Sequence, residues 1–160
     1  MFWGHQQSQT VTKSCLSHWY KSDFVIDGIS YSTAEQYMMA EKAKLFEDSD
    51  IYAQIVESNK PGKAKELGRQ VKNFDQKKWE ANRYKIVIDG NYQKFKQNSK
   101  LANFLINTQD RILVEASPVD HIWGIGLSQE DKSAYDPHFW NGLNLLGHAL
   151  METRDLLKNE

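Results

Sequence analysis

Cysteine and proline are scarce, because the 160-residue chain has one cysteine, Cys15, and three prolines. A single thiol forms neither an internal disulfide nor a cysteine-rich zinc site. Even the longest purely apolar stretches are short, such as Ile86-Val87-Ile88, whereas a membrane-spanning helix needs about 20 residues. No segment resembles the basic, apolar and small-residue regions of a secretory signal. We therefore expect a soluble, cytoplasmic protein with no membrane partner.

An excess of charge of one sign is also lacking. The 20 basic and 21 acidic side chains nearly cancel and leave a formal net charge of -1. This balance excludes a surface that is cationic everywhere and binds nucleic-acid phosphates, although it allows a local basic groove. The five histidines show no metal-binding spacing, and Gly124-Ile125-Gly126 lacks the third glycine of a phosphate loop. We therefore expect neither a metal ion nor a cofactor.

Aromatic residues, by contrast, make up 12% of the chain and include five tryptophans, which indicates a well-filled core, a stacking site or both. Repeats and long linkers are absent, so residues 1–160 are predicted to form one domain. A β-hairpin is predicted around Asp27-Gly28, between two short apolar segments. We expect a predominantly helical α+β domain with few strands, its helices at about 34–46, 50–58, 61–70, 75–95, 99–107 and 143–157 and one strand at 111–116.

One part of this prediction involves a conflict between local signals. Val87-Ile88-Asp89-Gly90 repeats Val25-Ile26-Asp27-Gly28, so hairpin chemistry competes with a helix there. We predict a helix because residues 76–83 contain no turn signal and a helical glycine costs only about 1 kcal/mol relative to alanine.

Glu35 and Lys42 are the first candidates for chemistry, because seven helical steps place them on one helix face with Cα atoms about 10 Å apart. Helical side chains lean toward the N-terminus, so the lysine amine leans toward the glutamate and a substrate can sit between them. The structural alternative for Glu35 is a capping box, in which the Ser32 hydroxyl and the Glu35 carboxylate cap the helix start. The alternative for Lys42 is a solvated surface lysine.

Residues 117–142 form an irregular segment, longer than a compact domain usually contains without a function for it. Within this segment, Trp123 can stack on a base or a sugar, and Asp120 can accept hydrogen bonds from hydroxyl groups or orient water. The alternatives are a structural role for Asp120 and a core position for Trp79.

Two further features are weaker. The helix start at 141–144 offers amide hydrogens to a phosphate, with Arg69 as a charge partner, or it is only a helix cap. Ser17 lies beside His18, but a nucleophilic serine needs a base and an orienting group that tertiary structure supplies.

These pieces occur in an order that resembles the YbiA-like, or NADAR, family, and the likeness spans nearly the whole chain. Order and spacing carry the resemblance, rather than any one motif. The matching stretches are Phe2-Trp3-Gly4-His5, residues 15–20, Ala34-Glu35-Gln36-Tyr37 with Lys42-Ala43, Gly68-Arg69, Trp79, Trp123-Gly124, and residues 140–147 with Leu150-Met151 and Arg154.

The resemblance implies a compact, mainly helical fold and N-glycosidase activity, either on early riboflavin-pathway intermediates or on ADP-ribosylated guanine. It implies catalytic roles for Glu35, Lys42 and Asp120. It also implies that seven residues bind the substrate: Trp123, Gly124, Arg69, Trp79, Asn144, Ser17 and Trp19. Two departures leave the identity of the substrate open: His18 stands where many members have asparagine, and an insertion at 128–139 lengthens the loop.

Breaking a ribosyl C1'–N bond builds positive charge on the sugar, which a carboxylate near C1' stabilises. Glu35 is predicted to do this or to handle the proton, while Asp120 holds ribose hydroxyls or the attacking water. Lys42 is predicted to form a Schiff base at C1' if Glu35 is protonated. Otherwise the lysine binds a phosphate or the leaving group, because an ionised Glu35 would keep it charged.

The expected substrate is a small ribosyl compound or an ADP-ribosyl group carried by DNA or RNA. A non-catalytic module that binds ADP-ribose is the alternative, and the loss of the Glu35–Lys42 pair would have signalled it. A purely structural domain whose tryptophans all belong to the core is a more remote alternative.

Overall fold

Helices make up most of the protein, whose computed structural model describes residues 1–160. The predicted class, a predominantly helical α+β domain, is confirmed. The α-helices are α1 (Ala34–Leu45), α2 (Ser49–Glu57), α3 (Pro61–Gly68), α4 (Gln76–Lys96), α5 (Ser99–Ile106) and α6 (Leu145–Lys158). One antiparallel sheet pairs β1 (Phe24–Ile26) with β2 (Ile29–Tyr31), and three 3-10 turns lie at η1 (Lys13–Leu16), η2 (Lys132–Tyr135) and η3 (Pro137–Phe139).

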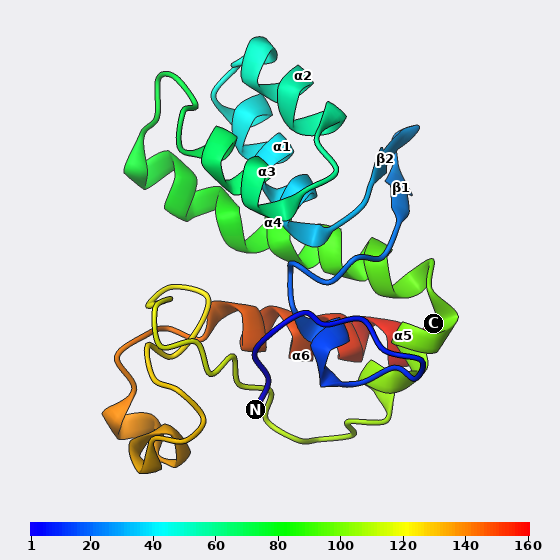
Figure 1. Ribbon diagram of the computed structural model, residues 1–160, viewed down its shortest axis with the longest axis vertical. Coiled ribbons are helices and arrows are strands. Elements are labelled where there is room, and N and C mark those ends of the chain that lie inside the picture. Colours follow the sequence, from blue (N-terminus) through cyan, green and yellow to red (C-terminus); the bar gives the residue numbers. More distant parts are fainter.

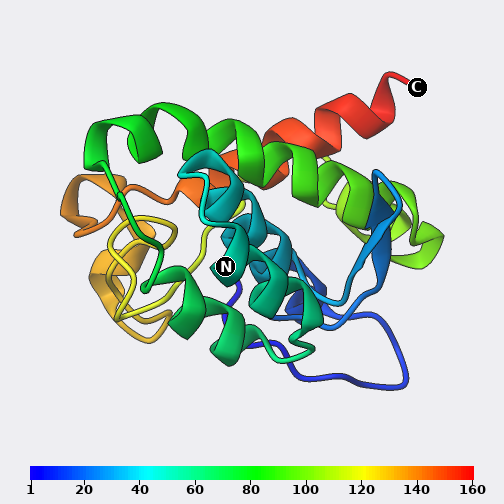
Figure 2. The same ribbon diagram turned by 90° about the horizontal axis from the view of Figure 1, so that it is seen from above.

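The long helix α4 runs between two halves of the molecule (Figure 1). One half contains α1, α2 and α3, which pack on one another, and α1 packs directly on α4. The other half contains α5, α6, the N-terminal segment and the irregular segment 117–142. Figure 2 shows α6 running beside α4, and these two helices are in contact. No helix has the length and the hydropathy that crossing a bilayer requires.

The hairpin forms where the sequence predicts it. Phe24 pairs with Tyr31 and Ile26 with Ile29, so Asp27 and Gly28 make the two-residue turn. Their φ angles are 51° and 78°, and this turn requires positive φ at both positions.

The start of α1 corrects the predicted capping box by one residue. Thr33, not Ser32, is the N-cap, and its hydroxyl accepts a hydrogen bond from the Gln36 amide at 3.1 Å. Gln36 reaches back with its side-chain oxygen, which accepts from the Ser32 amide at 2.7 Å. The structural alternative for Glu35 is therefore wrong, and its carboxyl group takes no part in the cap.

The helix prediction for Asp89-Gly90 is confirmed, because α4 continues from Gln76 to Lys96. Its start is capped by Asp75, whose carboxylate accepts from the Lys78 amide at 2.7 Å. A Cβ on Gly90 would lie 2.5 Å from Cδ1 of Tyr37. Glycine therefore lets α1 pack closely on α4 at this point.

The predicted strand at 111–116 is wrong. The segment makes only an isolated parallel bridge between Phe2 and Glu115. The Phe2 amide donates to the Val114 carbonyl at 2.9 Å, and the Ala116 amide donates to the Phe2 carbonyl at 2.9 Å. The N-terminal segment offers too few residues in register there for a regular ladder.

Candidate functional site

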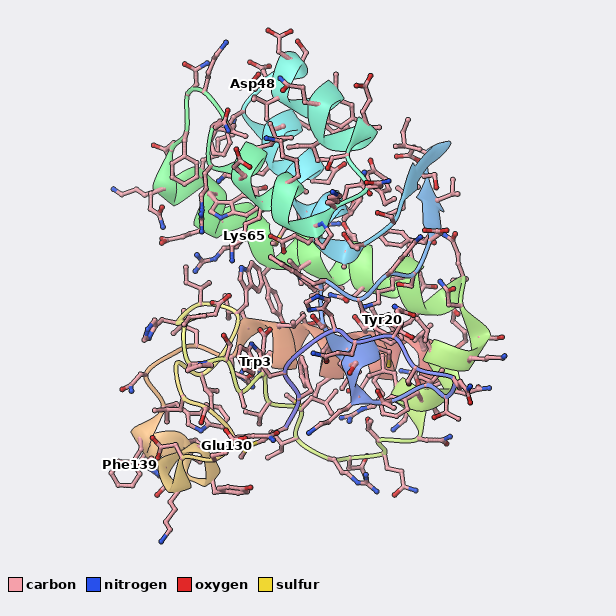
Figure 3. All side chains as sticks on the ribbon, in the orientation of Figure 1. Trp3, Tyr20, Asp48, Lys65, Glu130 and Phe139 are labelled. Atoms are coloured by element: carbon pink, nitrogen blue, oxygen red, sulfur yellow. The ribbon has the colours of Figure 1, made fainter.

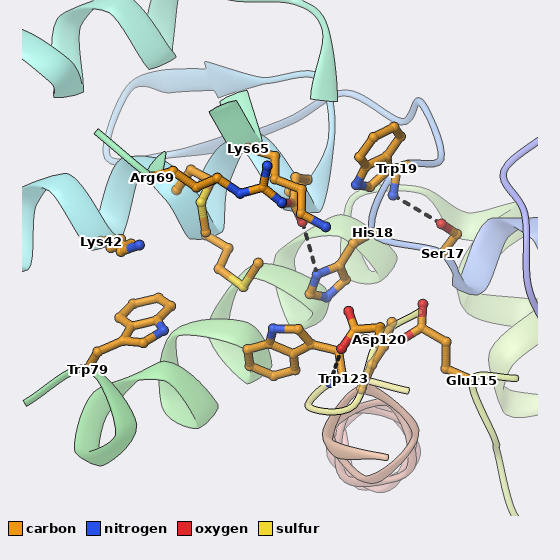
Figure 4. A pocket seen from close by; sticks show the side chains of 14 residues that line it. Ser17, His18, Trp19, Lys42, Lys65, Arg69, Trp79, Glu115, Asp120 and Trp123 are labelled. Atoms are coloured by element: carbon orange, nitrogen blue, oxygen red, sulfur yellow. Dashed lines mark hydrogen bonds and ion pairs between the residues drawn. The ribbon is translucent and has the colours of Figure 1, made fainter. Parts of the chain in front are cut away.

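A cavity of about 190 Å³ lies between the two halves of the molecule (Figure 4). Helix α1 contributes Glu35 and Lys42, and the other predicted residues come from distant segments. Most of the predicted site residues line this cavity: Ser17, Trp19, Glu35, Lys42, Arg69, Trp79, Asp120 and Trp123. The fold therefore brings the helix pair and the tryptophan-bearing loop to one place.

Glu35 lies in the first turn of α1 and is 5% exposed. Burial raises the pKa of its carboxyl group to about 7; Asp120 acts in the same direction, while Lys65, Arg69 and Lys42 oppose the shift. A carboxyl group with this pKa exchanges a proton near neutral pH, which suits acid–base work.

His18 is a close titratable neighbour of Glu35, with Nδ1 3.9 Å from Oε2. Burial, followed by the charge of Lys94, lowers the pKa of His18 to about 3, so the contact is not an ion pair at neutral pH. The side-chain amide of Asn91 donates to Val87 and lies 3.1 Å from Nε2 of His18. Since that amide nitrogen is a donor, we assign the imidazole proton to Nδ1, which faces Glu35.

Lys42 shares the cavity with Glu35 but forms no ion pair with it. Burial lowers the pKa of the Lys42 amine; Glu35 opposes the shift, and Arg69 adds to it. The amine lies 4.7 Å from the ring centre of Phe74 and 5.6 Å from that of Trp79. A half-buried lysine with aromatic neighbours and a nearby cation is the kind that enzymes activate as a nucleophile.

Asp120 orders the loop that carries Trp123. One carboxylate oxygen accepts hydrogen bonds from the amides of Ile122 at 2.9 Å and of Trp123 at 2.8 Å. This is the structural role that the sequence left open, and the residue lines the cavity as well. The Trp123 ring lies 6.0 Å from the His18 ring, so the indole and the imidazole form one wall.

Two predicted residues do not reach the cavity. Asn144 is fully buried; its side chain accepts from the Glu115 amide and donates to the Leu113 carbonyl, both at 3.0 Å. Gly124 is packed so closely that a Cβ would lie 3.0 Å from the carbonyl oxygens of Asp120 and Glu115. Both residues hold the loop together, which gives them structural roles, and their substrate contacts stay predictions.

The structure does not favour the predicted phosphate site at the start of α6. Five backbone amides there donate to the carbonyls of residues 121–125 and are not available to an anion: those of Asn141, Leu143, Asn144, Leu145 and Leu146. Arg69, its proposed charge partner, instead lines the cavity.

Sequence reasoning missed two charged residues of the cavity, Lys65 and Glu115. Lys65 precedes Arg69 by one helical turn on α3, and this spacing could have found it. Burial raises the pKa of Glu115 to about 8, and Asp120 and Glu35 add to the shift, while Lys65 opposes it. Glu115 carried no signal, because it was expected within an ordinary strand.

The cavity therefore combines carboxyl groups from three segments with cations from two helices and three tryptophans. No three histidine, cysteine, aspartate or glutamate side chains lie close enough together to hold a metal ion. The arrangement suits a ligand that has hydroxyl groups, negative charge and a planar ring.

The NADAR domain model matches residues 1–158. The chain belongs to the NADAR family. It is 42% identical over 145 residues to an N-glycosidase of Acanthamoeba polyphaga mimivirus, covering 88% of this chain and 85% of that protein. It is 28% identical over 143 residues to a riboflavin biosynthesis protein of Vibrio vulnificus, covering 89% of this chain and 35% of that protein.

The fold has a close counterpart in the NMR structure of the E. coli protein YbiA, with a TM-score of 0.76 and 26% sequence identity. The match covers 97% of this chain and 84% of that one. The predicted YbiA-like membership of the chain is thus confirmed in sequence and in fold.

Proposed function

We propose that this NADAR protein hydrolyses the bond between ribose C1' and an amino-substituted heterocycle, on a substrate whose sugar carries phosphate. The general class, a hydrolase of N-glycosyl compounds, follows from the family and from the N-glycosidase relative. One observation carries the rest of the proposal: Glu35 and Lys42 line the same cavity, and burial shifts the pKa of each toward its uncharged form.

The geometry of the pair weakens the objection to a nucleophilic lysine. No carboxylate lies within ion-pair distance of Lys42, and burial lowers the pKa of the amine although Glu35 opposes the shift. We therefore assign to Lys42 the attack on C1' and to ionised Glu35 the stabilisation of the charge that develops on the sugar.

The reaction proceeds through attack on C1', ring opening and hydrolysis. The lone pair of the Lys42 amine forms a bond to C1', and the C1'–N bond breaks with its electron pair going to the heterocycle, which takes up a proton. The sugar ring opens as its oxygen gains a proton and the lysine nitrogen loses one, which gives a Schiff base. Water then adds to C1' and releases the sugar and the neutral lysine.

The remaining side chains fit the binding of such a substrate. Trp123 offers a face for the base or the ribose, and Asp120 has a second carboxylate oxygen for hydroxyl groups. Arg69 and Lys65 bring positive charge for a phosphate or a diphosphate. These contacts suit both a phosphorylated ribosylamino-pyrimidine and an ADP-ribosylated guanine, either free or in an unpaired strand of DNA or RNA.

The test is an assay that offers both substrates side by side and detects the released base. We expect turnover of at least one of them, and an Asp89→Asn control on the exposed face of α4 should match the wild type. Turnover of neither substrate, together with tight binding of ADP-ribose, would instead establish a binding module.

A further inference from the structure

A second cavity, of about 490 Å³, adjoins the first one. The two cavities share Ser17, Trp19, Lys65, Glu115 and Asp120. We call the first the inner chamber and the second the outer chamber. The shared residues form the junction between the chambers, so a ligand that fills both must pass this junction.

Aromatic groups from the N-terminal segment form much of the outer chamber. Trp3 lines the cavity and is 55% exposed, and Val119, which also lines it, is 80% exposed. The His5 ring lies 5.5 Å from the Trp19 ring. Exposed indole and imidazole faces of this kind stack on planar heterocycles.

Glu115 stands at the junction on a backbone that is fixed on both sides. Its amide donates to the Asn144 side chain at 3.0 Å, and its carbonyl accepts from the Ile125 amide at 3.0 Å. The two residues that flank Glu115, Val114 and Ala116, are hydrogen-bonded to the backbone of Phe2. In its carboxyl group, Oε2 is buried and has no hydrogen-bond partner. A buried polar atom without a partner is costly, and a ligand atom at the junction would satisfy it.

The carboxyl group of Glu115 faces Asp120, Glu35 and Lys65, and burial raises its pKa to about 8. At neutral pH it is therefore mostly protonated and can donate. Figure 4 shows Glu115 and Lys42 on opposite sides of the inner chamber, with His18 between them. A proton donor opposite the nucleophile faces the side from which a leaving group departs.

We infer that the outer chamber receives the leaving heterocycle and that Glu115 is the general acid that protonates it. The proton moves from the Glu115 carboxyl to the ring or amino nitrogen as the C1'–N bond breaks, and that nitrogen keeps the electron pair of the bond. Water restores the proton to Glu115 during hydrolysis of the Schiff base. This inference rests on the proposed N-ribosyl hydrolysis and adds to it the identity of the acid and the place of the base.

Glu115→Gln tests the acid, because an amide has the same shape but cannot transfer the proton. We expect kcat to fall by about 10²–10⁴-fold, the range typical of a lost general acid. The wild-type rate should also decline above about pH 8, and this decline should vanish in the variant. A purely structural role would lower the rate without removing the decline.

Two results would overturn the role of Glu115: a kcat equal to that of the wild type, or a lowered kcat that keeps the alkaline decline. Because Oε2 has no partner to lose and burial opposes ionisation of the carboxyl group, we expect the variant to unfold at or above the wild-type temperature. If it does not fold, the pH profile of Glu115→Asp supplies the same readout, with a decline whose midpoint moves. Absence of turnover by the wild type would contradict the proposed function instead.

Trp3→Ala tests the outer chamber. We expect KM for the base-linked substrate to rise about 10-fold, with little change in inhibition by the ribose phosphate product, which leaves the outer chamber empty. Phe139→Ala is the matched control, since Phe139 is 61% exposed, lines neither cavity and lies well away from Trp3 (Figure 3). If Trp3→Ala weakens substrate and product binding equally, or changes neither, the outer chamber does not bind the base.

Discussion

The carboxyl group of Glu35 is held in the first turn of α1 with almost no contact with water. Its neighbour His18 is buried as well, and the Asn91 amide directs the imidazole proton toward Glu35. Burial therefore dominates both titrations, and it moves Glu35 toward neutral pH while it keeps His18 uncharged. His18 therefore presents a neutral N–H group to Glu35, and of the two side chains only the carboxyl group titrates near neutral pH.

Glu35→Gln should lower kcat by about 10²–10³-fold, because the sugar cation loses its carboxylate. In the wild type, activity should fall as the pH drops below about 7, where Glu35 becomes protonated. Steady-state rates from pH 5 to 9 measure both effects. Glu41→Gln, on the same helix and paired with Lys44 at the surface, is the control and should keep the wild-type profile.

The same change should stabilise the fold at alkaline pH. A carboxyl group whose pKa is raised from 4.5 to about 7 on folding adds stability below about pH 4.5, and this stability is lost as the pH rises through about 7. At pH 8, Glu35→Gln should therefore melt above the wild type. A lower melting temperature at that pH would mean that ionised Glu35 is stabilised by contacts that its burial does not suggest.

Asn144 is expected to matter for stability, because both ends of its side-chain amide bind backbone groups of other segments. Asn144→Gly keeps a residue that tolerates the observed φ of 52° but leaves a donor and an acceptor unpaired. We expect the free energy of unfolding to fall by about 1–3 kcal/mol, as measured by urea titration. A rise in KM at unchanged stability would instead support the predicted substrate-binding role of Asn144.

At the scale of elements, the helices and the hairpin could be predicted because their signals are local. Asp75 caps α4, and Asp27-Gly28 turns the hairpin. The shared tetrapeptide shows the limit of local signals, since Val-Ile-Asp-Gly forms a turn at residue 25 and a helix at residue 87. The second copy is helical, as its flanking residues predict, and its glycine packs on Tyr37 of α1. That tertiary contact is absent from any local pattern.

Gly90→Ala tests this contact, since alanine is the better helix former by about 1 kcal/mol. A Cβ at this position would overlap Tyr37, so we expect a net loss of about 1–3 kcal/mol of stability. Gly62→Ala in α3 is the matched control, because its Cβ would meet the Trp19 ring at an ordinary 3.6 Å. If Gly90→Ala proves stabilising in thermal unfolding, the packing of α4 on Tyr37 does not require glycine.

At the scale of the whole molecule, the cavity depends on contacts that no window of sequence contains. Glu115 reaches the junction because Phe2 and Asn144, both far away in the chain, hold its backbone. Lys65 approaches Glu35 only because α3 packs on α1. The resemblance to the family found most of the lining. Lys65 could have been found from its spacing to Arg69, whereas Glu115 required the fold.

The chemistry assigned to Lys42 is tested most directly by intact-protein mass spectrometry after borohydride reduction during turnover. The account predicts one covalent sugar adduct, mapped by peptide analysis to Lys42 and absent from Lys42→Arg, which keeps the charge but cannot form the Schiff base. Continued turnover with no adduct, or an adduct on Lys65 instead, would contradict it.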